Sequence, residues 1–273
     1  MSTQNQGSRA PHGAGGTGGK PVGKPPTVKK PVKPKEQEDR TILINFVLDK
    51  SGSMSSIRDA TISGFNEFLG DQQREGGEAR MTLTLFDTRF YTAAEAVPVR
   101  EMPALDHETY VPNGCTALYD AIGYAMRITD EYVSKHNPDQ VLFVIMTDGQ
   151  ENSSQEFDQR RVFDMIRDRQ HNAEYEFIYL GANQDAYVAS QKIGVAAGHA
   201  LTWTASPAEA SATMKRVSHN VRGYRRDGEK VMANNAFFSA DFEATGAIEY
   251  EEHKRRKQEA VDASDDAVDA SGN

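Results

Sequence analysis

Three side chains that carry oxygen occur at alternate positions in one short segment: Asp49, Ser51 and Ser53. Carboxylate and hydroxyl oxygens are hard ligands, which Mg²⁺ and Mn²⁺ prefer to nitrogen or sulfur. A glycine between the two serines permits the tight turn that would bring the three side chains toward one ion. The spacing therefore predicts part of a divalent-cation site. The alternative is that Ser55 or Ser56 simply caps the next helix.

Two later segments supply oxygen atoms of the same kind. Asp148 follows the apolar run 141–147, and Thr116 lies in a loop that opens a helix with apolar periodicity. In an open α/β sheet, ligands bind beyond the carboxyl ends of the strands. If the strands that end at Asp49 and Asp148 are neighbours, all the oxygen-bearing side chains lie at one edge of the sheet. The predicted metal ligands are Asp49, Ser51, Ser53, Thr116 and Asp148.

The elements that must position these side chains alternate between strand and helix patterns. Apolar and β-branched runs predict strands at 42–48, 81–87, 141–147, 175–180 and 199–204. The run 90–102 contains Pro98, which favours an edge strand. Helical periodicity is found at 57–69, 118–132, 157–166, 185–193 and 207–221. The alternation predicts an α/β fold with a doubly wound, mostly parallel sheet and helices on both faces.

Local patterns predict helix starts and loop roles. Capping patterns are found at Ser56 with Asp59, at Ser153 with Glu156, and at Ser206 with Glu209, where Pro207 takes the first helical position. After the Asp148 turn, Glu151 and Asn152 are expected at the loop surface, with a role near the metal as the alternative. Asn183 is expected in a turn.

This set of motifs resembles the von Willebrand factor A (vWA) domain with its metal-ion-dependent adhesion site (MIDAS). The matching segments are the loop from Asp49 to Ser53, the threonine of Gly114-Cys115-Thr116, and Thr147-Asp148-Gly149. The resemblance spans roughly residues 41–204 and implies a six-stranded, Rossmann-like sheet of order 3-2-1-4-5-6 with an antiparallel third strand. Residues 179–185 are similar to the intracellular bacterial and phage branch of the family.

The resemblance implies a binding role and no enzymatic activity. In the family, the two serines and the threonine contact the metal, and the two aspartates often act through water. Such a cation keeps net positive charge and an open position, which an acidic side chain of a partner protein can fill. We therefore expect a protein–protein interaction module that depends on Mg²⁺ or Mn²⁺. The partner is a protein that presents a carboxylate.

Two other functions remain open for the same residues. One is a Mg²⁺-dependent phosphoryl-transfer or phosphatase-like hydrolase, because such enzymes can place a nucleophilic aspartate at the end of the first strand. The haloacid-dehalogenase pattern, however, needs an aspartate where Ser51 stands, and the sequence contains neither a phosphate-binding P-loop nor a Gly-x-Ser-x-Gly elbow. The other is a structural vWA domain with a vacant site, against which the five matching ligands argue.

Composition indicates in which compartment the protein is expected and which classes of partner it is expected to lack. The single cysteine among 273 residues, Cys115, excludes an intramolecular disulfide and fits a reducing compartment. We expect this thiol to fill space, because no histidine that could activate it lies nearby. The sequence contains no apolar run of membrane-helix length and no signal-peptide core at its start, so we expect a cytoplasmic protein without membrane contact. A net charge of −9 argues against a general nucleic-acid binder.

Charge and composition divide the chain into three parts. Residues 1–39 are rich in Gly, Pro and Lys, and are expected to form a disordered tail. This tail is basic, so contact with nucleic acid or an acidic partner is its alternative to a linker role. Residues 40–223 are predicted to form the vWA domain. Residues 224–273 form an extension that is predicted to be partly helical, with a disordered acidic end from residue 262.

Overall fold

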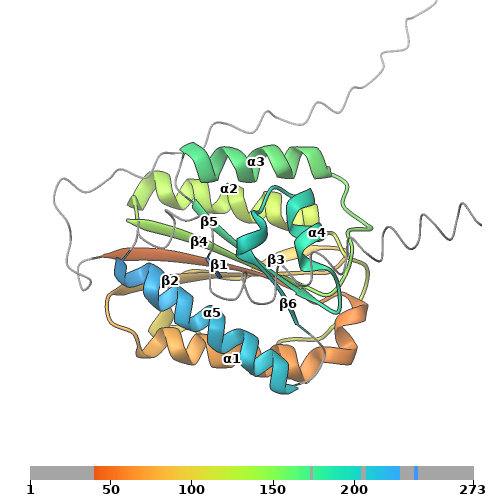
Figure 1. The fold of residues 1–273 in the computed structure, drawn as a ribbon, viewed down its shortest axis with the longest axis horizontal. Helices are drawn as coiled ribbons and strands as arrows, with labels where there is room; N and C mark the ends of the chain where they lie inside the picture. The colour runs from red at the N-terminus through yellow and green to blue at the C-terminus, as the bar shows by residue number, and fades with distance from the viewer. Residues whose placement is uncertain (1–39, 173–174, 204–206, 228–236, 239–273) are drawn as a thin grey trace, which may run out of the picture.

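The computed structural model describes residues 40–172, 175–203, 207–227 and 237–238, which alternate between strands and helices (Figure 1). The strands are β1 (Thr41–Asp49), β2 (Glu78–Phe86), β3 (Phe90–Pro98), β4 (Gln140–Thr147), β5 (Tyr175–Ala182) and β6 (Ala200–Trp203). The α-helices are α1 (Arg58–Arg74), α2 (Leu118–His136), α3 (Gln159–Asn172), α4 (Ala186–Lys192) and α5 (Pro207–Asp227). Short 3₁₀ helices are η2 (Gly52–Ile57), η3 (Val99–Glu101) and η4 (Ala197–His199).

The six strands form one sheet of order β3-β2-β1-β4-β5-β6. Every neighbouring pair is parallel except β2 and β3. The central strand β1 pairs with β2 along its whole length, up to Asp49 beside Phe86, and with β4 up to Leu48 beside Met146. The predicted strand order and the antiparallel edge strand are confirmed. The carboxyl ends of β1 and β4 therefore lie side by side.

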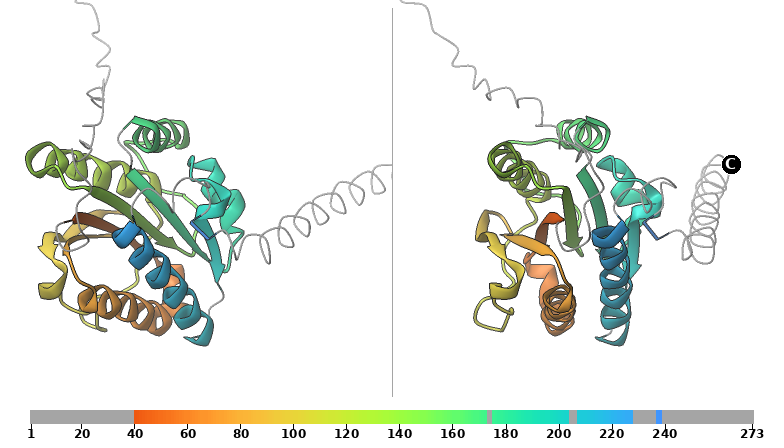
Figure 2. Two further views of the ribbon diagram at one scale, coloured as in Figure 1. Left: turned by 60° about the vertical axis from the view of Figure 1, so that its left-hand side comes forward. Right: turned by 90° about the vertical axis from the view of Figure 1, so that its left-hand side faces the viewer.

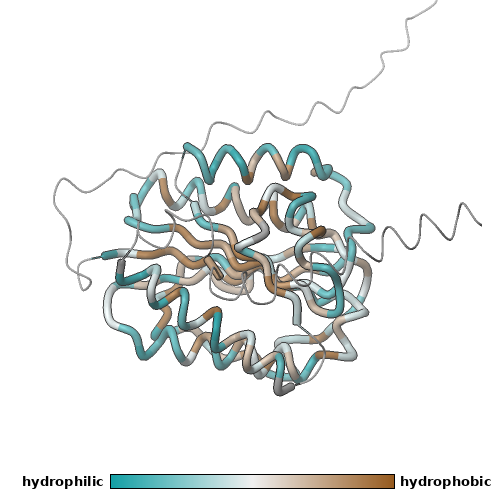
Figure 3. Tube along the Cα trace, in the orientation of Figure 1, coloured by the Kyte–Doolittle hydropathy of each residue, from teal (hydrophilic) through white to brown (hydrophobic). Residues whose placement is uncertain are grey.

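Helices cover both faces of the sheet. Helices α2 and α3 lie on one face, and α1 and α5 run next to each other on the other face (Figures 1 and 2). A hydrophobic core lies on each face of the sheet, and alternate residues of β1 point into one or the other. Phe46 packs in the core with α1 and α5, and Val47 packs in the core with α2 and α3. Figure 3 shows apolar residues concentrated in the strands and hydrophilic residues along the outer surfaces of the helices. The α/β fold expected from the sequence is confirmed.

Two predicted helix caps are wrong. The chain after β1 first forms the 3₁₀ helix η2, where the Ser56 hydroxyl donates to the Ser53 carbonyl (3.2 Å), and α1 begins without a side-chain cap. Helix α3 starts only at Gln159, and the Asp158 carboxylate accepts the amide of Arg161 (2.7 Å). The box predicted at Ser153 and Glu156 therefore precedes the helix. Helix α5 begins at Pro207 as predicted, whereas Ser206 lies outside the described residues.

The last described segments pack onto the sheet. Helix α5 continues through Gly223, the predicted domain boundary, and the next two side chains, Tyr224 and Arg225, are buried. Further on, the Phe238 amide donates to the carbonyl of Gly198 (2.9 Å). Residues 1–39 and the helix and acidic tail predicted after residue 247 lie outside the described part of the chain. None of the helices in the described ranges has the length and apolar character that a membrane span requires.

Candidate metal centre

Asp49 is the last residue of β1, and its carboxylate is fully buried. One carboxylate oxygen accepts the amide of Ser51 (2.6 Å), and the other accepts the hydroxyl of Thr147 (2.6 Å) at the end of β4. Its backbone carbonyl accepts the hydroxyl of the buried Tyr110 (2.5 Å). Burial raises the pKa of Asp49 to about 6, and the hydrogen bonds from Thr147 and Ser51 oppose this rise. Neutral donors thus hold this carboxylate in one orientation.

The two serines link the loop after β1 to the loop after β4. The hydroxyl oxygens of Ser51 and Ser53 lie 3.2 Å apart. Ser53 then donates to a carboxylate oxygen of Asp148 (2.7 Å). Asp148 is half-buried, and burial is the main cause that raises its pKa.

Thr116 approaches the same place from the loop before α2. A Cβ atom built on Gly149 would lie 3.1 Å from the Thr116 hydroxyl oxygen and 3.7 Å from that of Ser53. Both hydroxyl oxygens therefore lie within 4 Å of the point where a side chain at position 149 would begin. The structure brings together all five predicted residues: Asp49, Ser51, Ser53, Thr116 and Asp148.

These donors fit a small, hard cation. Within the described residues, neither Asp49 nor Asp148 forms an ion pair with a basic side chain, and the neighbouring Lys50 pairs with Asp87 instead. Desolvated carboxylates without a cationic partner favour binding of a positive ion. The described ranges hold no group of three or more His, Cys, Asp or Glu that could bind a metal, so a site here depends on its hydroxyl oxygens. An all-oxygen set of this kind suits Mg²⁺ or Mn²⁺.

Backbone hydrogen bonds join the loop after β1 to the loop that carries Thr116. The Gly52 amide donates to the carbonyl of Gly114 (3.0 Å), and the Asn113 amide donates to that of Lys50 (2.8 Å). Gly114 has a φ of +77°, a conformation that favours glycine. The next residue, Cys115, is exposed. The expectation that its thiol fills space is therefore wrong, because this loop presents the side chain at the surface.

Sequence reasoning missed how the loop after β4 supports Thr116. Asn152 is exposed, as expected, but its side chain accepts the Thr116 amide (2.8 Å). Glu151 accepts the amide of Tyr119 in the first turn of α2 (3.0 Å). The only signal in the sequence is the hydrogen-bonding capacity of these residue types. Asn183 has a φ of +52° and takes the turn role that was predicted.

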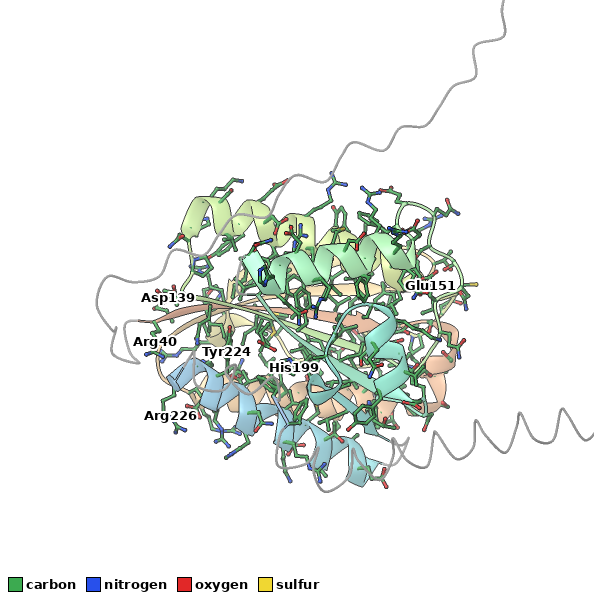
Figure 4. All side chains as sticks on the ribbon, turned by 45° about the horizontal axis from the view of Figure 1, so that its top comes forward. Arg40, Asp139, Glu151, His199, Tyr224 and Arg226 are labelled. Carbon is green, nitrogen blue, oxygen red and sulfur yellow. The ribbon has the colours of Figure 1, made fainter. Side chains whose placement is uncertain are left out.

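The candidate site and the start of the described chain lie at opposite ends of the sheet. In Figure 4, Glu151 marks the end with the site loops, whereas Arg40 and Asp139 lie at the far end. At that far end the Asp139 carboxylate accepts both the amide (2.9 Å) and the hydroxyl (3.1 Å) of Thr41.

No protein-family model matches this sequence, and no curated protein matches it. Three similar solved structures reach a TM-score of 0.50 or 0.51. Proximal thread matrix protein 1 from the mussel byssus, with a zinc-occupied MIDAS motif, is 18% identical over 67% of this chain and 48% of its own, with a TM-score of 0.50. This chain thus spans about half the length of the mussel protein.

The vWF domain of the type V pili tip protein Mfa5 from Porphyromonas gingivalis is 11% identical over 70% of this chain and 98% of its own, with a TM-score of 0.51. The pilus adhesin SpaC from Lactobacillus rhamnosus GG, in an open conformation, is 13% identical over 69% of this chain and 31% of its own, with a TM-score of 0.51. At such low identity, similarity of shape is evidence of the fold alone. This protein has the fold of a von Willebrand factor A domain.

Proposed function

We propose that this protein is an interaction module that depends on a divalent cation. The observation that carries the proposal is the convergence of five oxygen-bearing side chains from three loops. Two of the five are carboxylates, and no basic side chain of the described residues forms an ion pair with either. The residues that would hold the cation are Asp49, Ser51, Ser53, Thr116 and Asp148.

The chemistry of the five residues supports a partner that presents a carboxylate. Three of the five residues offer neutral hydroxyls. If these contact the cation and the two aspartates act through water, as the resemblance implies, no anionic oxygen of this chain would touch the cation, which would keep much of its positive charge. When bound, the cation would supply a positively charged position that a carboxylate of a partner protein can occupy. Thr147 and the Ser51 amide keep the Asp49 carboxylate fixed, and Ser53 does the same for Asp148. The hard oxygen donors support Mg²⁺ or Mn²⁺ as the metal.

The similarity to the mussel protein supports a divalent cation, since that structure has a zinc-occupied MIDAS motif. Binding is favoured over phosphoryl transfer by the environment of Asp49. Its carboxylate is fully buried, and both of its oxygens accept hydrogen bonds. A nucleophile must contact the substrate directly, whereas a buried aspartate can act on a cation through water, as the resemblance implies.

The test is a pull-down from a lysate of the source organism with tagged protein, in Mg²⁺ and in EDTA. We expect some proteins to be retained by the wild type only in Mg²⁺, and none of them by Asp148→Ala. The matched control is Asp164→Ala, the same change at an exposed position of α3. Circular dichroism checks that both variants are folded.

Retention of the same proteins in EDTA and in Mg²⁺ would contradict the proposal. Hydrolysis of a generic phosphoester by the wild type, lost in Asp49→Asn, would favour the hydrolase instead.

A further inference from the structure

Side-chain hydrogen bonds join the loop after β4 (residues 148–158) to the start of α2. Side chains from both segments reach across and accept backbone amides of the other. Residues 151–154 contribute acceptors to the helix, and Asp120 contributes acceptors to the loop. We call this set of contacts between Asn152, Glu151 and Asp120 and the opposite backbone the clasp.

Asn152 makes the contact nearest to the candidate site. Its side-chain oxygen accepts the backbone amide of Thr116 (2.8 Å), and its backbone amide donates to the carbonyl of Thr116 (3.0 Å). Both backbone groups of Thr116 are thus bonded to a single residue. Thr116 is only 3% exposed, so water cannot readily replace these bonds.

Two carboxylates, one on each segment, accept backbone amides of the other segment. Glu151 reaches from the loop to the helix and accepts the amide of Tyr119 (3.0 Å). Asp120 reaches from the helix to the loop and accepts three consecutive amides, those of Gln155, Glu156 and Phe157 (2.8, 2.9 and 2.8 Å). Amides at a helix N-terminus and in a turn otherwise lack partners, so both carboxylates satisfy groups that the fold leaves open.

We propose that the clasp positions the Thr116 hydroxyl before a cation arrives, and that Asn152 is the positioning residue. The inference rests on the proposed function in that Thr116 is taken as a metal ligand. Asn152 acts through Thr116 and does not itself touch the cation. Since outer partners of metal ligands typically change metal affinity by about 10- to 100-fold, loss of Asn152 weakens binding by about this factor.

The experiment compares full-length wild type with Asn152→Ala and Asn152→Ser, which both lose the long acceptor, and with Asn152→Asp, which keeps an acceptor at the same reach. The matched control is Gln150→Ala, an exposed residue two positions away in the same loop. Mn²⁺ affinity is measured by calorimetry. Amide hydrogen exchange of Thr116 is measured by NMR in EDTA, which reports on the clasp without any metal.

Asn152→Ala and Asn152→Ser are expected to weaken Mn²⁺ binding at least about tenfold. In EDTA, both should also speed exchange at Thr116 by a similar factor. Asn152→Asp and Gln150→Ala are expected to keep wild-type exchange and at least wild-type affinity.

Wild-type exchange at Thr116 in Asn152→Ala overturns the clasp, and so does unchanged Mn²⁺ affinity. Failure of the wild type to bind Mn²⁺ overturns the proposed function instead, and the exchange measurement still decides whether Asn152 holds Thr116. Lower thermal stability with unchanged metal affinity assigns Asn152 a purely structural role and also overturns the proposal.

Discussion

At the scale of single residues, the candidate site depends on space as much as on ligands. Gly149 follows Asp148, and its missing side chain leaves room for the hydroxyls of Thr116 and Ser53. Glycine is commonly required for a special backbone angle, but the φ of Gly149 is not positive. The absence of a Cβ atom is what the site needs here, because a methyl group would lie 3.1 Å from a predicted ligand.

We predict that Gly149→Ala weakens Mn²⁺ binding at least about tenfold while the free energy of unfolding changes by less than about 1 kcal/mol. The added methyl group forces the Thr116 hydroxyl to move. Position 149 is only partly buried and lies in the loop after β4, so the change leaves the packing of the core intact. Calorimetric titration and urea unfolding measure the two quantities.

The matched control for this change is Gly76→Ala, since a Cβ atom built there has no neighbour within 4 Å. Its Mn²⁺ affinity is expected to equal that of the wild type. Equal affinities in Gly149→Ala and in Gly76→Ala would show that the space beside Thr116 is not needed.

At the scale of elements, helix α2 packs closely against the end of the 148–158 loop at Gly123. A Cβ atom built on Gly123 would lie 2.5 Å from the ring of Phe157, the residue whose amide Asp120 accepts. The helix thus approaches the end of the 148–158 loop closely only because this position lacks a side chain. The same helix provides Tyr119 and Asp120 to the clasp, so its packing and the site geometry are coupled.

Two glycine substitutions in helices should have opposite effects. Gly123→Ala is predicted to lower the free energy of unfolding by about 1–3 kcal/mol, because the overpacking against Phe157 exceeds the helix-propensity gain of about 0.5–1 kcal/mol. Gly70→Ala in α1 should raise it by about 0.5–1 kcal/mol, because its Cβ atom would meet only the flexible Arg74 side chain at 3.4 Å. Urea denaturation of both variants measures the difference. A stabilising effect at Gly123 would contradict the close contact.

At the scale of the whole molecule, the core includes residues beyond the predicted boundary at 223. Phe237 and Phe238 are buried, at 4% and 3% exposure, in the core between the sheet and α1 and α5. The Phe237 ring lies 6.1 Å from the ring of His199, which pairs with the fully buried carboxylate of Glu176. The two phenylalanines therefore belong to the folding unit, and Phe237 lies beside the buried pair of His199 and Glu176.

We predict that the double variant Phe237→Ala, Phe238→Ala loses at least about 3 kcal/mol of folding free energy, the lower end for removal of even one buried phenylalanine. The control Phe163→Ala, at 39% exposure on α3, should lose less than about 1 kcal/mol. Guanidinium denaturation of full-length proteins measures both changes. Equal losses in the two variants would mean that the segment around Phe237 contributes nothing to stability.

Much of the architecture could be predicted because it depends on local periodicity. The predicted apolar stripe, which runs from Ile57 at the end of η2 to Leu69 in α1, is buried along its whole length. The five oxygen-bearing residues could be predicted because each follows a recognisable strand or precedes a helix. Strand order came from the resemblance to the vWA domain, since periodicity alone does not say which strands are neighbours.

The rest depends on contacts between distant segments, which one sequence does not reveal. Ser153 and Glu156 match a capping box, but the Glu156 amide is taken by Asp120, 36 residues earlier. Tyr224 is followed by two arginines, so its immediate neighbours give no sign that it is buried. Its spacing of three residues from Val221 continues the apolar stripe of α5, and this periodicity was the signal that could have identified it as core.

Strand β1 runs from the start of the described chain to the candidate site. The described chain enters at Arg40, and β1 carries it over about 30 Å, at roughly 3.3 Å per residue, to Asp49 at the site. This strand is paired in parallel on both sides, with β2 and with β4. If a partner binds at the proposed site, tension between it and Arg40 would load β1 along its length and shear both of its hydrogen-bond ladders. Shear of this kind breaks many hydrogen bonds together, whereas peeling an edge strand breaks them one at a time.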